Sequence, residues 1–380
     1  MKHSGSDPGI KREGLKRFAR PALAPYAENQ AGPRMCQLDS VRSLVSSLLL
    51  AVCGAAISGA CAAQPPKSAE AETAQAPSGG KTVRPGPWTP PAGLVQTPLW
   101  PGEVPDMENV NLPPESVLVN PTPQALFGVT SEAALDVSVP TMTVIPARGK
   151  PNGAAILVFP GGGFKAVVLT LQGTEICDWV TAQGMACILV KYRVPRTAHH
   201  YDASCDCGVE PDRPRALQDA QRAIRLVRSR SEELGIDPGR IGVMGFSAGG
   251  YLAVQTSNIF EPAYTPVDAV DTVSSRPDFA ISFYPGHLCR PGDKLPANLN
   301  VTSNTSPTFL IAAWDDDVNP ICNSTLYARA LDAAGVPAEV HFFAKGGHAF
   351  ARRTPEARHA IWPELVKGWL TERGIIGEQP

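Results

Sequence analysis

The sequence predicts an α/β fold with a largely parallel central sheet. From about residue 140 onward, short apolar runs alternate with helical patterns, as is typical of a parallel sheet with helices on its faces. The runs are almost continuously hydrophobic, as expected of strands covered on both sides. With 43% hydrophobic and 18% charged residues among 380, the chain can build a large core, which excludes an intrinsically disordered protein. A net charge of −2 provides no basic surface for a phosphate backbone, so we expect no nucleic acid partner.

The segment before this alternating region has the pattern of an export signal. An apolar run from Leu44 to Ile57 follows Arg42 and leads to Ala60-Cys61-Ala62, which fits a small-residue cleavage site. We therefore expect residues 1–63 to be an N-terminal extension and signal peptide, with Met35 as the true start, and the mature protein to be periplasmic or extracellular. A membrane anchor is disfavoured because the run is short for a span. A lipid anchor at Cys61 is an alternative, although the preceding residues lack the usual Leu or Val.

Residues 64–105 are rich in Pro, Ala, Gly and Ser and show no hydrophobic periodicity. This composition predicts a linker or a wrapping arm. The α/β domain is then expected to cover residues 106–375, as a single domain.

Within this domain the expected strands and helices follow one another in order. The buried strands are expected at 154–159, 185–190, 241–245, 279–284, 308–313 and 340–344. An apolar stripe from Ala216 to Val227 predicts a helix, and further helices are expected at 326–334 and 358–370. Arg222, Arg225 and Arg228 lie opposite the stripe, where we expect a solvated face rather than a binding patch. Upstream, 135–139 and 141–145 are expected to pair as antiparallel strands.

Six cysteines follow the signal, and export would favour disulfides among them. They are Cys177, Cys187, Cys205, Cys207, Cys289 and Cys322, and the sequence does not select their pairing. Cys187 lies in an apolar strand and is expected to be a small buried hydrophobic residue. Cys205, Cys207 and Cys289 lie in loop-like segments, where a bridge is favoured. A metal site at Cys205 and Cys207 is disfavoured because no CxxC partner or adjacent His accompanies them.

Gly245-Phe246-Ser247-Ala248-Gly249 is the strongest local signal for chemistry. It follows the strand at 241–245 and precedes a helical sequence. Glycines on either side of the serine permit a sharp strand-to-helix turn that exposes a nucleophilic hydroxyl. The alternative is a glycine-rich helix start with a capping serine. Placement directly after a buried strand favours the nucleophile, Ser247.

A nucleophilic serine needs a base, and the base needs an orienting acid. In this architecture the acid and then the histidine follow the serine, each in a loop after a later strand. Asp315-Asp316-Asp317 follows the strand at 308–313, and we favour Asp316 over Asp315, with Asp317 third. A solvated or cation-binding acidic turn is the alternative for these three carboxylates.

His348 is the expected base because it lies in a Gly-rich loop after the last strand. The other histidines after the serine are less suitable. His341 lies within a strand, His359 lies in the last helix, and His287 precedes the candidate acids.

The sequence Phe159-Pro160-Gly161-Gly162-Gly163-Phe164 follows the first buried strand, where esterases of this layout carry their oxyanion loop. Residues without side chains allow backbone N–H groups to approach a substrate. We expect Gly162, Gly163 and Ala248 to donate to the oxyanion. A dinucleotide-binding loop is discarded because the G-x-G-x-x-G spacing and the following acid are absent.

Together these segments resemble the α/β-hydrolase superfamily over roughly residues 95–375, and more narrowly the bacterial acetylxylan-esterase-like carbohydrate esterases. The resemblance rests on LWPGEVP from Leu99, FPGGGF from Phe159, LVKYRVP from Leu189, DAQRAIRLVRSR from Asp219, GIDPGRIGVMGFSAGGYLA from Gly235, RPDFAISFYPG from Arg276, PTFLIAAWDDDVNP from Pro307 and GVPAEVHFFAKGGHAF from Gly335.

The resemblance implies an α/β-hydrolase fold, Ser247 as nucleophile, His348 as base and Asp316 as acid, without metal or organic cofactor. It also implies removal of acetyl or other short acyl groups from polysaccharides such as xylan. Val318-Asn319-Pro320 departs from the Val-Pro pair common in relatives. Residues 196–212 and 286–306 look like insertions that line the site, so the resemblance does not select the substrate.

We therefore expect an exported serine esterase that acts on a polysaccharide or small acyl ester through an acyl-enzyme. A peptidase resembling the prolyl-oligopeptidase group is the first alternative, although that group usually carries a large propeller domain for which the chain has no room. A short-chain lipase is the second. The non-enzymatic alternative is an inactive hydrolase-like protein that binds carbohydrate, against which the intact Ser, Asp and His argue.

Overall fold

The computed structural model describes residues 80–108, 110–120, 130–194, 200–202, 207–209, 214–350 and 357–377. All of them belong to one unit, Thr73–Pro380. The expected signal peptide, the start at Met35 and the lipid-anchor candidate Cys61 lie outside the described residues. Among the helices that the structure describes, none is both long and apolar enough to cross a membrane.

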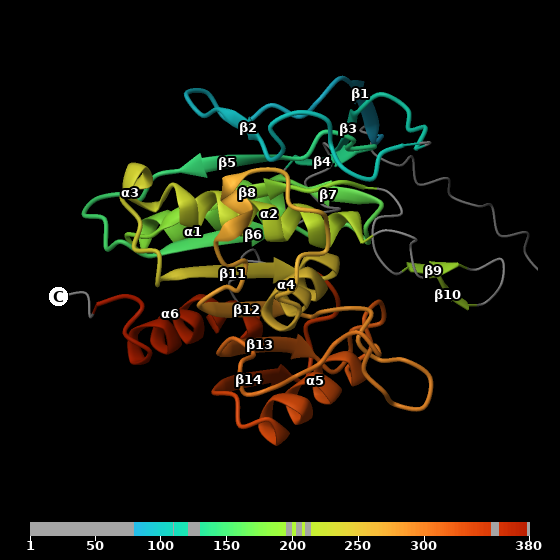
Figure 1. The fold of residues 1–380 in the computed structure, drawn as a ribbon. Coiled ribbons are helices and arrows are strands. Elements are labelled where there is room, and N and C mark those ends of the chain that lie inside the picture. Colours follow the sequence, from blue (N-terminus) through green and yellow to red (C-terminus); the bar gives the residue numbers. More distant parts are fainter. Residues whose placement is uncertain are drawn as a thin grey trace, which may run out of the picture. The chain divides into compact units, whose positions relative to one another are not determined.

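The centre of the unit is an eight-stranded sheet in the order β14-β13-β12-β11-β6-β8-β5-β2 (Figure 1). Its neighbours from β14 to β8 are all parallel. These strands are β6 (Ala155–Phe159), β8 (Ala186–Lys191), β11 (Ile241–Phe246), β12 (Phe279–Phe283), β13 (Thr308–Ala313) and β14 (Ala338–Phe343). Every residue of β6, β11, β12 and β13 is buried, because helices cover both faces. The predicted fold class and all six strands are confirmed.

The expected pairing of 135–139 with 141–145 is wrong. β4 (Ser131–Leu135) belongs to a separate four-stranded sheet, whereas β5 (Thr141–Ile145) pairs antiparallel with β8 and with β2 (Gln96–Pro98) in the main sheet. Asp136 has a φ of 54°, and Pro140 has no N–H to donate to a ladder. The chain therefore leaves one sheet after β4 and enters the other at β5. The remaining strands of the smaller sheet are β1 (Thr82–Pro85), β3 (Ser116–Asn120) and β7 (Ala166–Val168).

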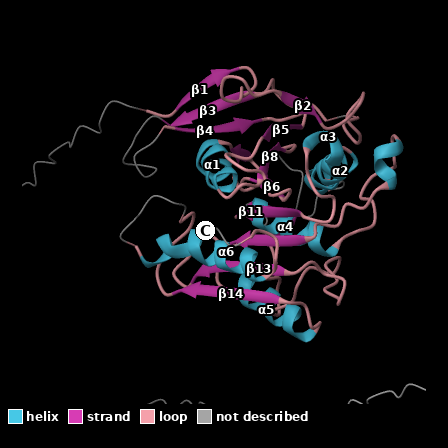
Figure 2. Ribbon diagram, turned by 90° about the vertical axis from the view of Figure 1, so that its left-hand side faces the viewer, coloured by secondary structure: helices cyan, strands magenta, loops and turns pink. Residues whose placement is uncertain are grey.

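The helices flank the main sheet. They are α1 (Glu175–Ala182), α2 (Arg215–Ser229), α3 (Ser231–Leu234), α4 (Ala248–Asn258), α5 (Cys322–Ala333) and α6 (Trp362–Glu372), with a π-helical turn at Thr170–Thr174 and 3-10 turns at Ala269–Thr272 and Arg358–Ile361. Figure 2 shows α1 and α6 on one face and α2 and α4 on the other. Trp179 of α1 and Trp362 of α6 lie in edge contact, with ring centroids 5.3 Å apart. The short strands β9 (His200–Asp202) and β10 (Cys207–Val209) pair antiparallel with each other.

The arginine face of α2 is covered by another segment of the chain, so the expectation of a solvated face is wrong. Arg222 is only 1% exposed and pairs with Asp268 at 2.6 Å and Asp271 at 3.0 Å. Arg225 donates to the Tyr264 hydroxyl. Arg228 pairs with the carboxylate of Asp278 at 3.0 Å. The chain after α4 folds over the outer face of α2 and supplies these acceptors.

The described part of the segment 64–105 packs on the domain. β2 extends the main sheet, and Trp88, Leu99 and Trp100 are buried. The Trp100 indole N–H donates to Asp219 of α2 at 2.9 Å. The buried indole therefore holds this arm against α2, while the domain boundary at residue 105 stays a prediction.

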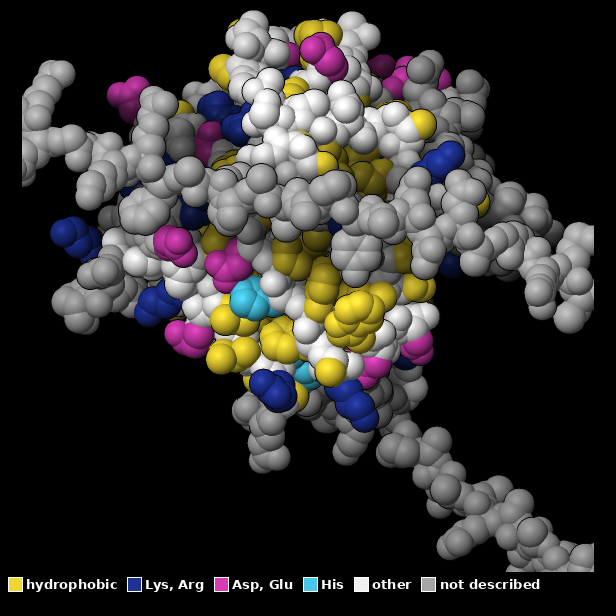
Figure 3. Space-filling model, turned by 90° about the horizontal axis from the view of Figure 1, so that it is seen from below, with side chains coloured by type: hydrophobic (Ala, Val, Ile, Leu, Met, Phe, Trp, Pro, Cys, Tyr) yellow, Lys and Arg dark blue, Asp and Glu magenta, His cyan; other side chains and the backbone are white. Residues whose placement is uncertain are grey.

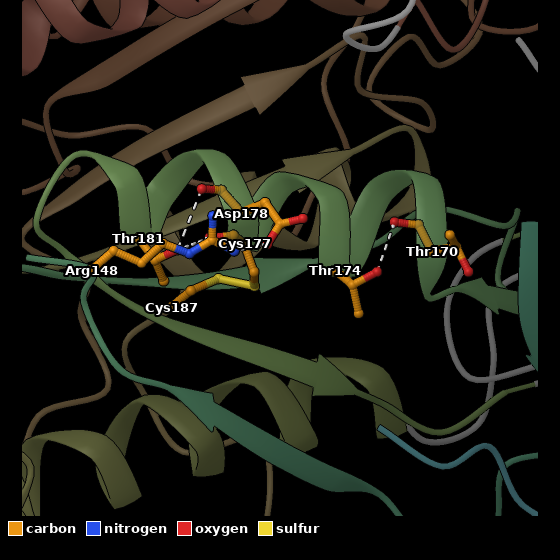
Figure 4. Close-up of a disulfide and its surroundings, with 7 residues drawn as sticks. All are labelled: Arg148, Thr170, Thr174, Cys177, Asp178, Thr181 and Cys187. Atoms are coloured by element: carbon orange, nitrogen blue, oxygen red, sulfur yellow. Dashed lines mark hydrogen bonds and ion pairs between the residues drawn. A yellow bond between two sulfur atoms is a disulfide. The ribbon is translucent and has the colours of Figure 1, made fainter. Parts of the chain in front are cut away.

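Within the described residues, two disulfides join parts of the domain. Cys177 of α1 and Cys187 of β8 are bonded, with Cα atoms 5.3 Å apart (Figure 4). The prediction that Cys187 is a simple buried hydrophobic residue is therefore wrong: it is buried, but α1 packs directly on β8 and brings a second thiol to it. Cys289 is bonded to Cys322 at the start of α5, which confirms a bridge at Cys289. Cys205 and the side chain of Cys207 lie outside the described residues.

Candidate active site

The carboxyl edge of the parallel sheet brings three predicted residues together. Ser247 follows β11, Asp316 follows β13 and His348 follows β14. The His348 Nε2 lies 3.0 Å from the Ser247 Oγ, although the two residues are 101 positions apart. The His348 Nδ1 lies 2.9 Å and 3.0 Å from the two carboxylate oxygens of Asp316. The arrangement is one that can pass a proton from a hydroxyl to an imidazole held by a carboxylate.

Ser247 occupies a strained turn between β11 and α4. Its φ of 55° and ψ of −116° lie outside the regions that residues with side chains favour. A Cβ at Gly245 would lie 1.9 Å from the carbonyl oxygen of Gly249, and a Cβ at Gly249 would lie 1.9 Å from that of Phe159. No larger residue fits at either glycine, so both are needed to bring the backbone this close on the two sides of the serine.

The two neighbouring carboxylates after β13 have different partners. Asp316 is buried, and its Oδ1 also accepts the backbone N–H groups of Val318 and Asn319. Asp315 is exposed and accepts the N–H groups of Gly346 and Gly347 at 2.8 Å and 2.7 Å. The Gly347 N–H in particular holds the pKa of Asp315 below its usual range. Asp316 thus contacts the imidazole, whereas Asp315 holds the loop that carries it; the third candidate, Asp317, is exposed.

The Gly161–Gly163 loop lies against the serine turn. A Cβ on Gly161 would come within 3.0 Å of the Ser247 Cβ. Gly162 has a φ of 133°, and a Cβ there would lie 2.2 Å from the carbonyl oxygen of Ala166. Ala248 is the first residue of α4, so its N–H has no acceptor within the helix. The backbone at Gly161 and the start of α4 therefore border Ser247, while the roles of Gly162, Gly163 and Ala248 as donors stay a prediction.

Sequence analysis missed three residues that contact this site. The Tyr284 ring packs edge-on against the His348 imidazole, with centroids 5.1 Å apart, and burial raises the pKa of its phenol. Gln172 accepts the Gly161 N–H at 2.8 Å and donates to the Tyr284 hydroxyl at 3.5 Å. Asn319 places its amide 3.4 Å from the Ser247 Oγ. Tyr284 is the last residue of one predicted strand and Asn319 lies in the turn after another, which was a usable signal; Gln172 lies in a π-helical turn that no pattern marks.

A cavity of about 610 Å³ lies beside the His348 loop and is not lined by Ser247. Its lining residues are Phe342, Phe343, Ala344, Lys345, Gly346, Ala357, Arg358 and His359. Hydrophobic side chains gather on the face of the molecule seen in Figure 3.

Within the described ranges, no three or more His, Cys, Asp or Glu side chains converge in a way that could hold a metal ion.

His359 is expected to make the stability of the domain depend on pH. It is buried against Phe350, with ring centroids 5.1 Å apart, and burial lowers the pKa of its imidazole. The unfolded chain therefore protonates the His359 imidazole at a higher pH than the folded chain does. The contribution of neutral His359 to the free energy of unfolding is fully present above the ordinary histidine pKa of about 6.5. It is lost as the pH falls through the lowered pKa of the folded state.

We expect His359→Phe to reduce the fall in unfolding free energy between about pH 7 and pH 5, the range around an ordinary histidine pKa. Urea unfolding of both proteins across this range measures it. Curves that stay parallel for the wild type and the variant would show that His359 does not contribute.

Two family models match the chain. The BD-FAE family matches residues 143–261, and the Prolyl oligopeptidase family matches residues 215–373. The second range contains Ser247, Asp316 and His348.

A curated relative, an acetylxylan esterase of Xylanibacter ruminicola, is 29% identical over 244 residues, which are 58% of this chain and 46% of that protein. The chain thus spans about half the length of this relative. Among solved structures, an acetyl ester-xyloside bifunctional hydrolase of Caldicellulosiruptor lactoaceticus is 30% identical with a TM-score of 0.56, and the match covers 74% of this chain and 97% of that one. A propionate-bound esterase of Thermogutta terrifontis is 26% identical with a TM-score of 0.52, over 64% of this chain and 94% of that one. The chain therefore belongs to the acetylxylan-esterase-like family of α/β-hydrolases.

Proposed function

We propose that the protein is a serine carboxylic ester hydrolase that removes acetyl or other short acyl groups from carbohydrate esters. The observation that carries this proposal is the row of contacts from Ser247 through His348 to Asp316. A hydroxyl 3.0 Å from an imidazole nitrogen can transfer its proton as it attacks a carbonyl carbon. The strained turn holds the serine where a substrate can meet it.

In the proposed reaction, the Ser247 Oγ forms a bond to the ester carbonyl carbon while its proton passes to the His348 Nε2. The carbonyl oxygen becomes an oxyanion that accepts hydrogen bonds from the N–H groups of Gly162, Gly163 and Ala248. The bond to the sugar oxygen then breaks, and His348 returns the proton to that oxygen. A water molecule attacks the acyl-serine with His348 as its base, which releases the carboxylic acid and restores Ser247. Asp316 holds the imidazole in the required tautomer throughout.

The names of the relatives support a short acyl group on a carbohydrate. One relative is an acetylxylan esterase, another acts on acetyl esters and xylosides, and a third was solved with propionate. Ser247 is only 8% exposed, which suits a small acyl group better than a long chain. The two disulfides fit an oxidising compartment, and we retain export to the periplasm or the extracellular space as part of the proposal.

Acetate release from acetylated xylan and acetylated pectin, together with kcat/KM for chromogenic esters of increasing acyl length, tests the substrate class. We expect release from at least one polysaccharide and the highest kcat/KM for the shortest acyl chains. Values that rise with acyl length would favour a lipase. A protein that binds polysaccharide without releasing acetate would contradict the enzymatic proposal.

The match to the Prolyl oligopeptidase family favours a serine peptidase as a second candidate. The Ser247 Oγ, with His348 as its base and Asp316 holding the imidazole, could also attack the carbonyl carbon of an amide. A chromogenic prolyl amide distinguishes the two activities, and we expect it to remain uncleaved at enzyme concentrations that hydrolyse the acetate ester.

A further inference from the structure

Asn319 contacts both the nucleophile and the acid of the site. Its side-chain Nδ2 lies 3.4 Å from the Ser247 Oγ, and its backbone N–H donates to Asp316 at 2.8 Å. The residue stands within Val318-Asn319-Pro320, the segment that departs from the pattern of the resembling family. A polar amide thus occupies a place beside the nucleophile that the family resemblance did not assign.

The environment fixes which way the amide points. The Asn319 Nδ2 donates to the carbonyl oxygen of Tyr284 at 2.9 Å. With the amide reversed, two oxygens would face each other at that distance, so the nitrogen must lie on this side. An amide nitrogen carries two hydrogens, and the second is free to donate to the Ser247 Oγ.

Gly286 provides the space that holds this amide. A Cβ on Gly286 would lie 2.7 Å from the Asn319 Oδ1. Any side chain at 286 would therefore push the amide away from its position between Tyr284 and Ser247. The geometry of Asn319 depends on a glycine in a different loop, which offers an independent way to disturb it.

We propose that Asn319 is a further catalytic residue, which donates a hydrogen bond to the Ser247 Oγ; this assignment rests on the proposed function. Oγ donates its proton to the His348 Nε2 and accepts from Asn319, so the hydroxyl is held with its proton aimed at the base. As the proton leaves, negative charge grows on Oγ and strengthens the bond from the amide. Hydrogen bonds of this kind are often long in a free enzyme and tighten as the reaction proceeds.

This role differs from that of the oxyanion loop. Gly162, Gly163 and Ala248 are placed to bind the carbonyl oxygen of the substrate, whereas Asn319 acts on the attacking oxygen. Asn319 should therefore affect the rate at which Ser247 reacts with any electrophile, whether or not that electrophile contains a carbonyl group.

The test compares Asn319→Val, which keeps a similar volume without a donor, with Asn319→Asp, which keeps the shape but presents acceptors. Asn304→Val is the matched control, because Asn304 is exposed in the loop before β13, at the opposite edge of the sheet. The two readouts are kcat/KM for a chromogenic acetate ester and the rate of Ser247 phosphonylation by a chromogenic phosphonate. We expect Asn319→Val to lower both rates by about tenfold to a hundredfold, as for loss of a hydrogen bond to a charged group, and Asn319→Asp to lower them further. The control should match the wild type.

Gly286→Ala supplies a second variant, in which Asn319 itself is not substituted. Because its Cβ displaces the amide, we expect a loss in the wild-type background and little further loss when Asn319→Val is already present. Such non-additivity reports coupling through the amide. A purely structural effect of Gly286→Ala would instead be the same in both backgrounds.

The outcomes distinguish a failure of the proposed function from a failure of the role assigned to Asn319. A wild-type protein that neither hydrolyses the acetate ester nor reacts with the phosphonate would overturn the proposed function and this assignment with it. An active wild type, with folded Asn319→Val and Asn319→Asp variants that react at its rate, would overturn the role of Asn319 alone. If both substitutions prevented folding, equal losses from Gly286→Ala in ester hydrolysis and phosphonylation would support the assignment, and unchanged rates would overturn it.

Discussion

Ser247→Ala is expected to lower kcat for a chromogenic acetate ester by roughly four to six orders of magnitude. The Oγ is the attacking atom in the proposed reaction and the only atom removed by the substitution. His348 and Asp316 then have no nucleophile to activate, and the remaining rate comes from binding and the oxyanion loop alone. Because alanine relieves no clash and removes no buried carbon, we expect the melting temperature to change little.

Ser257→Ala is the matched control for this substitution. Ser257 lies in α4, ten residues after the nucleophile, and its hydroxyl donates only to the Ala253 carbonyl of the same helix at 2.7 Å. We expect its kcat to match the wild type. Wild-type kcat in Ser247→Ala, at a purity that excludes contaminating esterases, would remove the basis of the proposed mechanism.

Asp316→Asn is expected to lower kcat by about three to four orders of magnitude, while Asp315→Asn lowers it only a few-fold. An amide at position 316 can donate to the His348 Nδ1, which favours the tautomer that carries its proton on Nε2. That nitrogen faces the Ser247 Oγ and could then no longer accept its proton. Asp315 accepts the backbone N–H groups of the loop at Gly346 and Gly347, so its loss loosens the loop without changing the tautomer.

The pair of variants separates two carboxylates that the sequence places side by side. Asp317→Asn, at an exposed position of the same turn, controls for the loss of one negative charge. Equal losses from Asp315→Asn and Asp316→Asn would contradict the distinct roles that the contacts assign to them.

The main sheet and the glycine turn could be predicted because their signals are local. Runs such as Ala155–Phe159 and residues 309–313 are hydrophobic at every position, as expected of strands that are buried on both faces. Gly245 and Gly249 flank the serine at the spacing that the close backbone contacts demand. From these elements, the order of strands was sufficient to select His348 and the acidic turn at residues 315–317, within which Asp316 was only favoured over Asp315.

The features that sequence analysis missed depend on partners far along the chain. The solvated face expected on α2 is buried because Asp268 and Asp271 fold over Arg222, and no periodicity within α2 reports that. The bond at Cys187 depends on where α1 packs. Asn319 gains its significance only from its distance to Ser247, which follows from the three-dimensional arrangement of two loops.

Capture of the acyl-enzyme tests the central claim most directly. The protein is mixed with a chromogenic acetate ester, quenched in acid during the first turnover and analysed by intact and peptide mass spectrometry. We expect one acetyl group per chain, located on the peptide that contains Ser247 and absent from Ser247→Ala. Turnover without an acetylated serine, or an acetyl group on another residue that Ser247→Ala leaves in place, would contradict the account.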